Sequence, residues 1–188
     1  YIPGEFKIFD ELIVNALDQY TRCMEKVVLE PKTSLVKNIK VNFNKETGEI
    51  SVYNDGEGIC VEMHEKEKVY VPELIFGSLL TSSNYTENEK KHVGGKNGYG
   101  AKLTNIFSKI FTIETGDNIN KKNYKQTFYD NMTRRDEPII TPYKGKGYTQ
   151  ITYTPDYSRF NSGLTDDMIK IIKKRTYDMA ACTDSKVS

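Results

Sequence analysis

The sequence predicts one α/β domain, a two-layer arrangement in which a mixed β-sheet is covered on one face by helices. Two stretches with apolar residues at every third or fourth position, 6–26 and 165–181, predict amphipathic helices. Six shorter stretches between them are rich in apolar or β-branched residues and predict strands. A chain of 188 residues is long enough for one domain with its own core, so we expect a single unit over 1–188.

The composition gives no sign of a nucleic-acid-binding, cysteine-metal or membrane-spanning protein. There are 27 Lys and Arg against 26 Asp and Glu, a formal net charge of +1, so total charge carries no nucleic-acid signature. Cys23, Cys60 and Cys182 are far apart and lack metal-binding spacing, which favours reduced intracellular thiols. No apolar run is long enough to span a membrane, and no signal peptide is visible. The chain begins without methionine, and we expect it to be part of a larger protein.

The first helix, 6–26, combines an apolar stripe with a polar one. Its polar stripe has a spacing of four, three and four residues, which places side chains along one side of a helix. Such faces are usually solvated and carry ordinary ion pairs. Asn15 has a low helix propensity for a position in mid-helix, so its place beside Glu11 favours a functional site over a solvated face. The apolar stripe is Phe6, Phe9, Ile13, Leu17 and Tyr20, and the polar stripe is Glu11, Asn15, Asp18 and Arg22.

A β-hairpin follows the loop 30–36. Apolar residues alternate in 39–43 and again in 50–54, and a turn with Gly48 separates the two strands. The second strand leaves through Asn54-Asp55-Gly56-Glu57-Gly58, where glycines permit a tight turn. Taken alone, this is a common turn sequence.

Proline, capping residues and apolar stretches predict the remaining helices and strands. Pro72 opens a short helix over 72–80, because proline is well suited to a first helical turn. The polar span 81–98 is too long for a simple connection and predicts a lid that is mobile without nucleotide. Thr165 is expected to cap the last helix, whose first turn carries Asp166 and Asp167. The other strands are expected at 111–115, 125–129, 139–141 and 149–153.

The segment 94–102, Gly-Gly-Lys-Asn-Gly-Tyr-Gly-Ala-Lys, stands out. Leu103, Ile106 and Phe107 recur at helical spacing after it, so a helix is expected to begin at Tyr99 or Gly100. Glycines allow close backbone approach, and a helix start offers free N–H groups to phosphate. The segment therefore predicts a phosphate cradle.

A glycine cluster is more often a flexible surface loop, and the familiar nucleotide templates do not fit this one. A Walker P-loop needs Ser or Thr where Asn97 stands, and a kinase loop needs glycine where Leu103 stands. A dinucleotide fingerprint requires a strand where the charged run 86–92 lies. If phosphate binds here, another fold binds it.

Together, these motifs resemble the Bergerat-fold (GHKL) ATPases and, more closely, the ATPase domain of eukaryotic-type DNA topoisomerase II. The resemblance covers nearly the whole chain, from Pro3 to Val187, and the glycine-rich motif is its most specific part. The matching stretches are Lys-Ile-Phe-Asp-Glu at 7–11, Val-Asn-Ala at 14–16, Tyr-Val-Pro at 70–72, 79–85, 94–103, Lys-Gln-Thr-Phe at 125–128 and Asp-Asn-Met at 130–132.

The resemblance implies roles for individual residues. Glu11 would be the general base that activates water, and Asn15 would bind Mg²⁺ through its amide oxygen. Asn54 would hydrogen-bond the adenine edge, helped by Thr149. The remaining implied ATP contacts are Gly58 and Ile59 near the base, Ser82, Ser83 and Asn84 at ribose or phosphate, and Gly95, Lys96, Asn97, Gly98, Tyr99, Gly100, Ala101 and Lys102 around the triphosphate.

Two features depart from the family pattern. The family commonly has Arg where Lys96 stands; lysine keeps the charge but lacks the bidentate fork. The connection 21–36 is longer than usual, and we expect it to change a surface loop.

Asp55 could be mistaken for the adenine contact, but the spacing to Gly56 and Gly58 selects Asn54.

The implied function is the ATP-hydrolysing gate of a type IIA topoisomerase. ATP would order the lid and join two such domains in a homodimer, and the full enzyme would act on double-stranded DNA in the nucleus, without a membrane. An N-terminal arm would precede Tyr1; a transducer and the DNA-cleavage domains would follow Ser188. The alternatives are a chaperone or mismatch-repair ATPase of the same fold, or a dimerisation module that no longer hydrolyses ATP.

Overall fold

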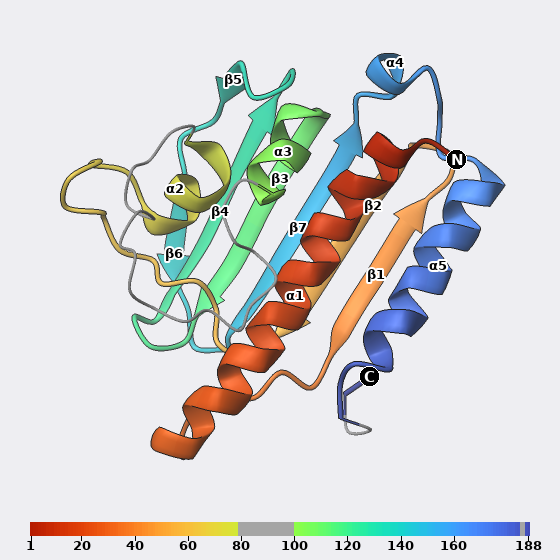
Figure 1. Ribbon diagram of the computed structural model, residues 1–188. Helices are drawn as coiled ribbons and strands as arrows, with labels where there is room; N and C mark the ends of the chain where they lie inside the picture. The colour runs from red at the N-terminus through yellow and green to blue at the C-terminus, as the bar shows by residue number, and fades with distance from the viewer. Residues whose placement is uncertain (79–99, 185–186) are drawn as a thin grey trace.

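The computed structural model describes residues 1–78, 100–184 and 187–188. Figure 1 shows two layers, a twisted β-sheet and a set of helices that lie against one of its faces. The predicted α/β two-layer arrangement is confirmed. Along the chain, the elements are α1 (Pro3–Leu29), β1 (Ile39–Asn44), β2 (Glu49–Asp55), α2 (Val71–Gly77), α3 (Gly100–Ile106), β3 (Ser108–Asp117), β4 (Lys122–Tyr129), β5 (Arg134–Arg135), β6 (Ile139–Pro142), β7 (Tyr148–Pro155), α4 (Tyr157–Phe160) and α5 (Asp166–Ala180).

The sheet has the strand order β1-β2-β7-β3-β4-β5, with β6 also paired to β4. All ladders between these strands are antiparallel. The register places Asn54 of β2 opposite Thr149 of β7, and Thr149 opposite Thr115 of β3. Since directly opposite residues point to the same face of a sheet, these three side chains form a row across its middle.

The core lies between the sheet and α1. This helix buries one stripe of side chains, and the stripe packs on apolar residues from the middle strands. The helix α5 completes the layer beside β1 (Figure 1). Chief contributors are Ile8, Phe9, Leu12 and Ile13 of α1, Val52, Phe111, Ile113 and Ile151 of the sheet, and Met168 and Ile172 of α5.

Most helices and strands were predicted correctly, but their first and last residues differ from the predicted ones. The first helix begins earlier than 6–26 and continues to Leu29, with Pro3 in its first turn and Pro31 just beyond its end. Thr165 caps α5 as predicted, because its side chain accepts a hydrogen bond from the Met168 N–H at 3.2 Å. The two-residue strand β5 and the single-turn α4 were not predicted, since neither is long enough to show periodicity.

The carboxylate of Glu5 is buried where the start of α1 meets the loop after α4. Ser162 Oγ donates to Glu5 Oε2 at 2.6 Å, whereas Oε1 has no hydrogen-bond partner among the described residues. Burial raises the pKa of Glu5 above its ordinary 4.5, and the Ser162 bond only partly offsets this. The folded state therefore favours the protonated acid, and this contribution to stability is lost as the pH rises through the raised pKa.

Replacing Glu5 by Gln should consequently stabilise the protein at neutral and higher pH. The amide keeps the shape of the acid and cannot ionise, so we expect Tm to rise by about 2–4 °C near pH 8. The gain should shrink towards about pH 4, where the native glutamic acid is protonated. Thermal unfolding across this pH range measures the effect, and the exposed Glu46→Gln is the control. A gain that is equal at both ends of the range would contradict the assignment.

Candidate functional site

Glu11 and Asn15 lie one turn apart on α1, at the margin of its buried stripe. Both are half-buried. Lys7 Nζ donates to Glu11 Oε1 at 2.6 Å, and this hydrogen bond raises the pKa of the Lys7 ammonium. The Asn15 amide makes no hydrogen bond with any residue that the structure describes, so it is free to contact a ligand. The helix thus places a carboxylate and an unengaged amide side by side.

The first turn of α3 contacts Glu11 directly. A Cβ on Gly100 would collide with Glu11 Oε2, so the α3 backbone approaches the carboxylate as only glycine allows. Thr104 holds the two helices together, because its Oγ1 donates to the Ile8 carbonyl at 2.8 Å. The structure therefore joins Glu11 to Gly100 of the glycine-rich segment, which lies 89 positions later in the sequence.

Two residues at the start of α3 point into the protein. Ala101 belongs to the buried core, and the side chain of Lys102 is buried as well. Burial lowers the pKa of the Lys102 ammonium, because desolvation disfavours the charged form. Lys102 is thus held within the protein at this helix start.

Asn54 is buried at the end of β2, and its Nδ2 donates to the Asp55 carbonyl at 2.9 Å. The carboxylate of Asp55 is engaged elsewhere. It accepts from the backbone N–H groups of Lys37 and Asn38, at 2.7 and 2.8 Å, and from Asn38 Nδ2 at 2.6 Å. Successive strand residues point to opposite faces, so Asn54 faces the helices together with buried Val52. The geometry favours Asn54 over Asp55 as the ligand contact, in line with the spacing argument.

The turn after β2 packs tightly on β3. A Cβ on Gly58 would collide with the Gly116 carbonyl oxygen, and the Ile59 N–H donates to Thr115 Oγ1 at 2.9 Å. Thr115 is fully buried and donates in turn to the Tyr148 carbonyl at 2.7 Å. Sequence reasoning missed Thr115, because a threonine in a strand is unremarkable until the register places it beside Thr149.

Asp117 fixes the chain that leaves this turn. Burial raises the pKa of Asp117, but hydrogen bonds from Asn120, from Val61 and from Ile119 together lower it more, so the net shift is downward. The contact to the Val61 N–H is 2.8 Å long and ties the segment after Ile59 to the end of β3. The carboxylate therefore acts as a structural clamp.

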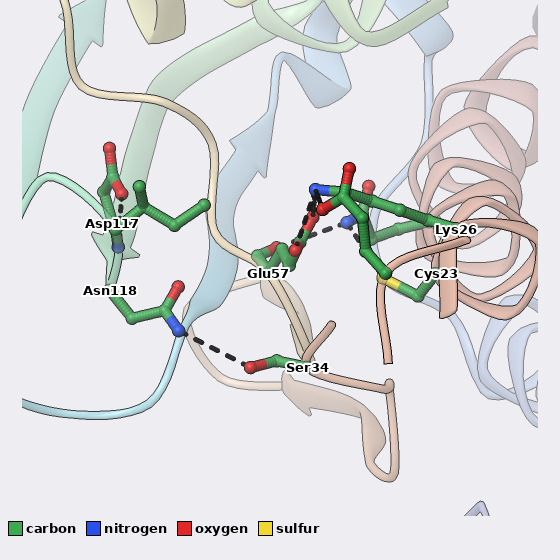
Figure 2. Close-up of polar contacts among 9 residues, drawn as sticks. Cys23, Lys26, Ser34, Glu57, Asp117 and Asn118 are labelled. Atoms are coloured by element: carbon green, nitrogen blue, oxygen red, sulfur yellow. Dashed lines mark hydrogen bonds and ion pairs between the residues drawn. The ribbon is translucent and has the colours of Figure 1, made fainter. Parts of the chain in front are cut away.

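The far half of α1 supports the same turn from the other side. Lys26 Nζ lies 3.0 Å from both carboxylate oxygens of Glu57, and Gln19 Nε2 donates to the Glu57 carbonyl at 3.3 Å. Figure 2 shows this ion pair on one side of Glu57 and the segment Asp117–Asn118 on the other. The expectation that 21–36 changes only a surface loop is wrong for its first part, which is helical to Leu29 and anchors the turn.

The structure brings some of the predicted residues together, whereas others lie outside the residues that it describes. Gly100 contacts Glu11, which lies one turn from Asn15 in the middle of α1, while Asn54, Thr149, Gly58 and Ile59 gather at the sheet. Eight predicted contacts, Ser82, Ser83, Asn84, Gly95, Lys96, Asn97, Gly98 and Tyr99, lie outside the described residues, as does the predicted lid.

Over 1–78, 100–184 and 187–188, no cluster of three or more His, Cys, Asp or Glu side chains could hold a metal ion, and the three cysteines are free thiols. None of the helices described is both long and apolar enough to cross a bilayer.

The chain is similar to known proteins in both sequence and structure. No family model matches the chain. It is 50% identical over 181 residues to "DNA topoisomerase 2" of Penicillium chrysogenum, and 48% identical over 188 residues to that of Plasmodium falciparum. These matches cover 96% and 100% of this chain but only 11% and 13% of the relatives, so the chain spans a small part of their length.

Solved structures of ATPase domains also match the chain. The ATPase region of Saccharomyces cerevisiae topoisomerase II matches with a TM-score of 0.85 and 47% identity, over 95% of this chain and 45% of that one. The 43K ATPase domain of Thermus thermophilus gyrase B matches with a TM-score of 0.63 at 22% identity, which is evidence for the fold alone. That match covers 90% of this chain and 39% of the gyrase chain.

Proposed function

Because the chain is homologous over nearly its whole length to the ATPase region of DNA topoisomerase II, we propose that it is the ATP-binding and ATP-hydrolysing gate of a type IIA topoisomerase. The observation that carries the proposal is the contact between Glu11 and Gly100. It places a carboxylate at the start of the helix that follows the glycine-rich segment. A helix start offers N–H groups and partial positive charge to phosphate, so the carboxylate lies where a terminal phosphate and its attacking water would be held.

Each residue then has a separate task. Glu11 accepts the proton of the attacking water, and Lys7 positions its carboxylate. Asn54 accepts from the exocyclic amine of adenine through Oδ1, which receives no hydrogen bond from a described residue. Thr149 lies opposite Asn54 on β7, and Thr115 lies one strand further along the same row, on β3. Gly58 and Ile59 would form the wall beside the base. The glycine-rich segment, from Gly95 to Lys102, would wrap the triphosphate.

Magnesium fits the donor set. The Asn15 amide oxygen is a hard ligand without a described partner, and Mg²⁺ commonly combines one or two protein oxygens with substrate phosphates and water. Bound there, Mg²⁺ would neutralise charge on the triphosphate. Asn15 would therefore act in binding, whereas Glu11 would act in the chemical step.

Replacing Asn15 by Ala should weaken the binding of Mg·ATP by at least about 10-fold, because loss of a metal contact costs at least this much. Isothermal titration with Mg·ATP, and with ATP in a chelator, measures the effect in the full-length protein. The exposed Asn42→Ala is the matched control. An Asn15→Ala protein that binds normally and loses only turnover would contradict the metal role.

The proposal extends to the complete protein. Residues 1–188 would form the ATPase domain, with an arm before Tyr1 and with transducer and DNA-cleavage domains after Ser188. ATP binding would join two copies across a double-stranded DNA segment, and hydrolysis would reset the gate in the nucleus. ATP-dependent relaxation of supercoiled plasmid and decatenation of linked circles test this directly. ATP hydrolysis without either reaction would favour a different ATPase of this fold, and ATP binding without hydrolysis would favour a dimerisation module.

A further inference from the structure

Four charged side chains form a line of contacts from α5 to the proposed catalytic base. Arg175 of α5 donates through Nε to Asp10 Oδ1 of α1 at 2.6 Å. Lys7 Nζ lies 3.5 Å from the other oxygen of Asp10, Oδ2, and 2.6 Å from Glu11 Oε1. Positive and negative charges alternate along this line, so each group has a neighbour of opposite sign.

The Lys7 ammonium lies between two carboxylates that compete for it. Asp10 and Glu11 follow Lys7 by three and four positions, and both spacings bring side chains together on the surface of a helix. The Lys7 side chain is 59% exposed, and its long, flexible stem allows the ammonium to turn to either partner. The place of the ammonium therefore depends on how much negative charge each carboxylate has left uncompensated.

Asp10 is already compensated from its other side. The Arg175 guanidinium is always charged at neutral pH, and it approaches Asp10 more closely than Lys7 does, at 2.6 Å against 3.5 Å. Arg175 comes from α5, which packs beside α1 although the two helices lie at opposite ends of the chain. Lys7 is thus left with its closer contact to Glu11.

The contact with Lys7 also determines how the Glu11 carboxylate is turned. Lys7 holds Oε1, and Oε2 is the oxygen that a Cβ on Gly100 would overlap. One oxygen is therefore fixed by the ammonium while the other faces the first turn of α3. A general base must be aligned with the proton that it accepts, and a small displacement of such a group lowers the rate strongly.

We propose that Asp10 and Arg175 are positioning residues for ATP hydrolysis, because Arg175 neutralises Asp10 and so leaves Lys7 to Glu11. The inference rests on the proposed role of Glu11 as the base. Asp10 and Arg175 act through Lys7 rather than on the nucleotide. Without the guanidinium, Asp10 would draw the ammonium away, and the Glu11 carboxylate would lose its fixed orientation.

Steady-state ATP hydrolysis by the full-length protein tests this assignment. Replacing Arg175 by Gln removes the charge and should lower kcat by about 10-fold, with KM changed by less than about 2-fold. Adding Asp10→Asn removes the charge that attracts Lys7, so kcat should recover by at least about 5-fold. Lys174→Gln is the matched control, because Lys174 is an exposed cation on the same helix that pairs with Asp178.

The double variant separates positioning from a purely structural role. If the bond between Arg175 and Asp10 only held α1 to α5, the second substitution would not restore the rate. Arg175→Lys keeps the charge and should hold kcat within about 3-fold of the native value. A native kcat in Arg175→Gln, no recovery in the double variant, or an equally large loss in Arg175→Lys would overturn the proposal.

A crystal structure of the Arg175→Gln protein gives a second test that needs no activity. Lys7 Nζ should lie within hydrogen-bond distance of Asp10 and beyond about 4 Å from Glu11. The native arrangement of Lys7 in this protein would overturn the proposal. The Glu11→Gln protein keeps the two hypotheses apart: hydrolysis at the native rate would refute the base itself, whereas loss of hydrolysis there and a native rate in Arg175→Gln would refute only the positioning.

Discussion

Replacing Glu11 by Gln is expected to lower the ATP hydrolysis rate of the full-length protein by about 10²–10⁴-fold, with ATP binding intact. Glutamine keeps the size of the side chain and its hydrogen bonding but cannot accept the proton of water. The carboxylate meets the first residue of α3, where we propose that the terminal phosphate lies, so its loss should affect the reacting end of the nucleotide. The closed, nucleotide-bound dimer should therefore accumulate.

The measurement combines steady-state phosphate release with ATP titration on the same protein. Glu25→Gln is the matched control, because Glu25 is exposed on the same helix. Cross-linking or light scattering follows the dimer. A Glu11→Gln protein that no longer binds ATP, or that hydrolyses it at the native rate, would show that Glu11 is not the base.

Replacing Gly58 by Ala is expected to disrupt the turn beside the proposed adenine site. The added Cβ would overlap the Gly116 carbonyl oxygen and lie 3.1 Å from Thr115 Oγ1. Backbone atoms of a paired strand cannot move aside, and Gly147 packs against the turn on another side. We expect the free energy of unfolding to fall by about 1–3 kcal/mol and the Kd for ATP to rise by at least about 10-fold.

Thermal unfolding and ATP titration measure the two effects separately. Gly163→Ala is the control, since a Cβ at Gly163 meets no atom within 4 Å. If Gly58→Ala bound ATP and unfolded like the control protein, the tight packing of this turn would have no bearing on the site.

The sequence by itself determined most of the helices and strands and indicated the candidate side chains Glu11, Asn15 and Asn54. Apolar periodicity located the two long helices, and the side chain of Thr165 marked the start of α5 because its capping bond is local. Glu11 and Asn15 could be paired from their spacing alone, since one helical turn separates them. The glycine-rich segment was the most specific part of the resemblance, and the relatives at about 50% identity agree with that resemblance.

Tertiary structure alone decided which distant residues meet. Thr115 enters the row with Asn54 and Thr149 through the sheet register, and no local pattern encodes the register of strands far apart in sequence. The bond between Lys26 and Glu57 likewise depends on how α1 crosses the sheet. Ser188 reaches β1 only because α5 carries the chain back along the edge. Contacts of this kind arise from packing and long-range hydrogen bonds, which a one-dimensional pattern cannot express.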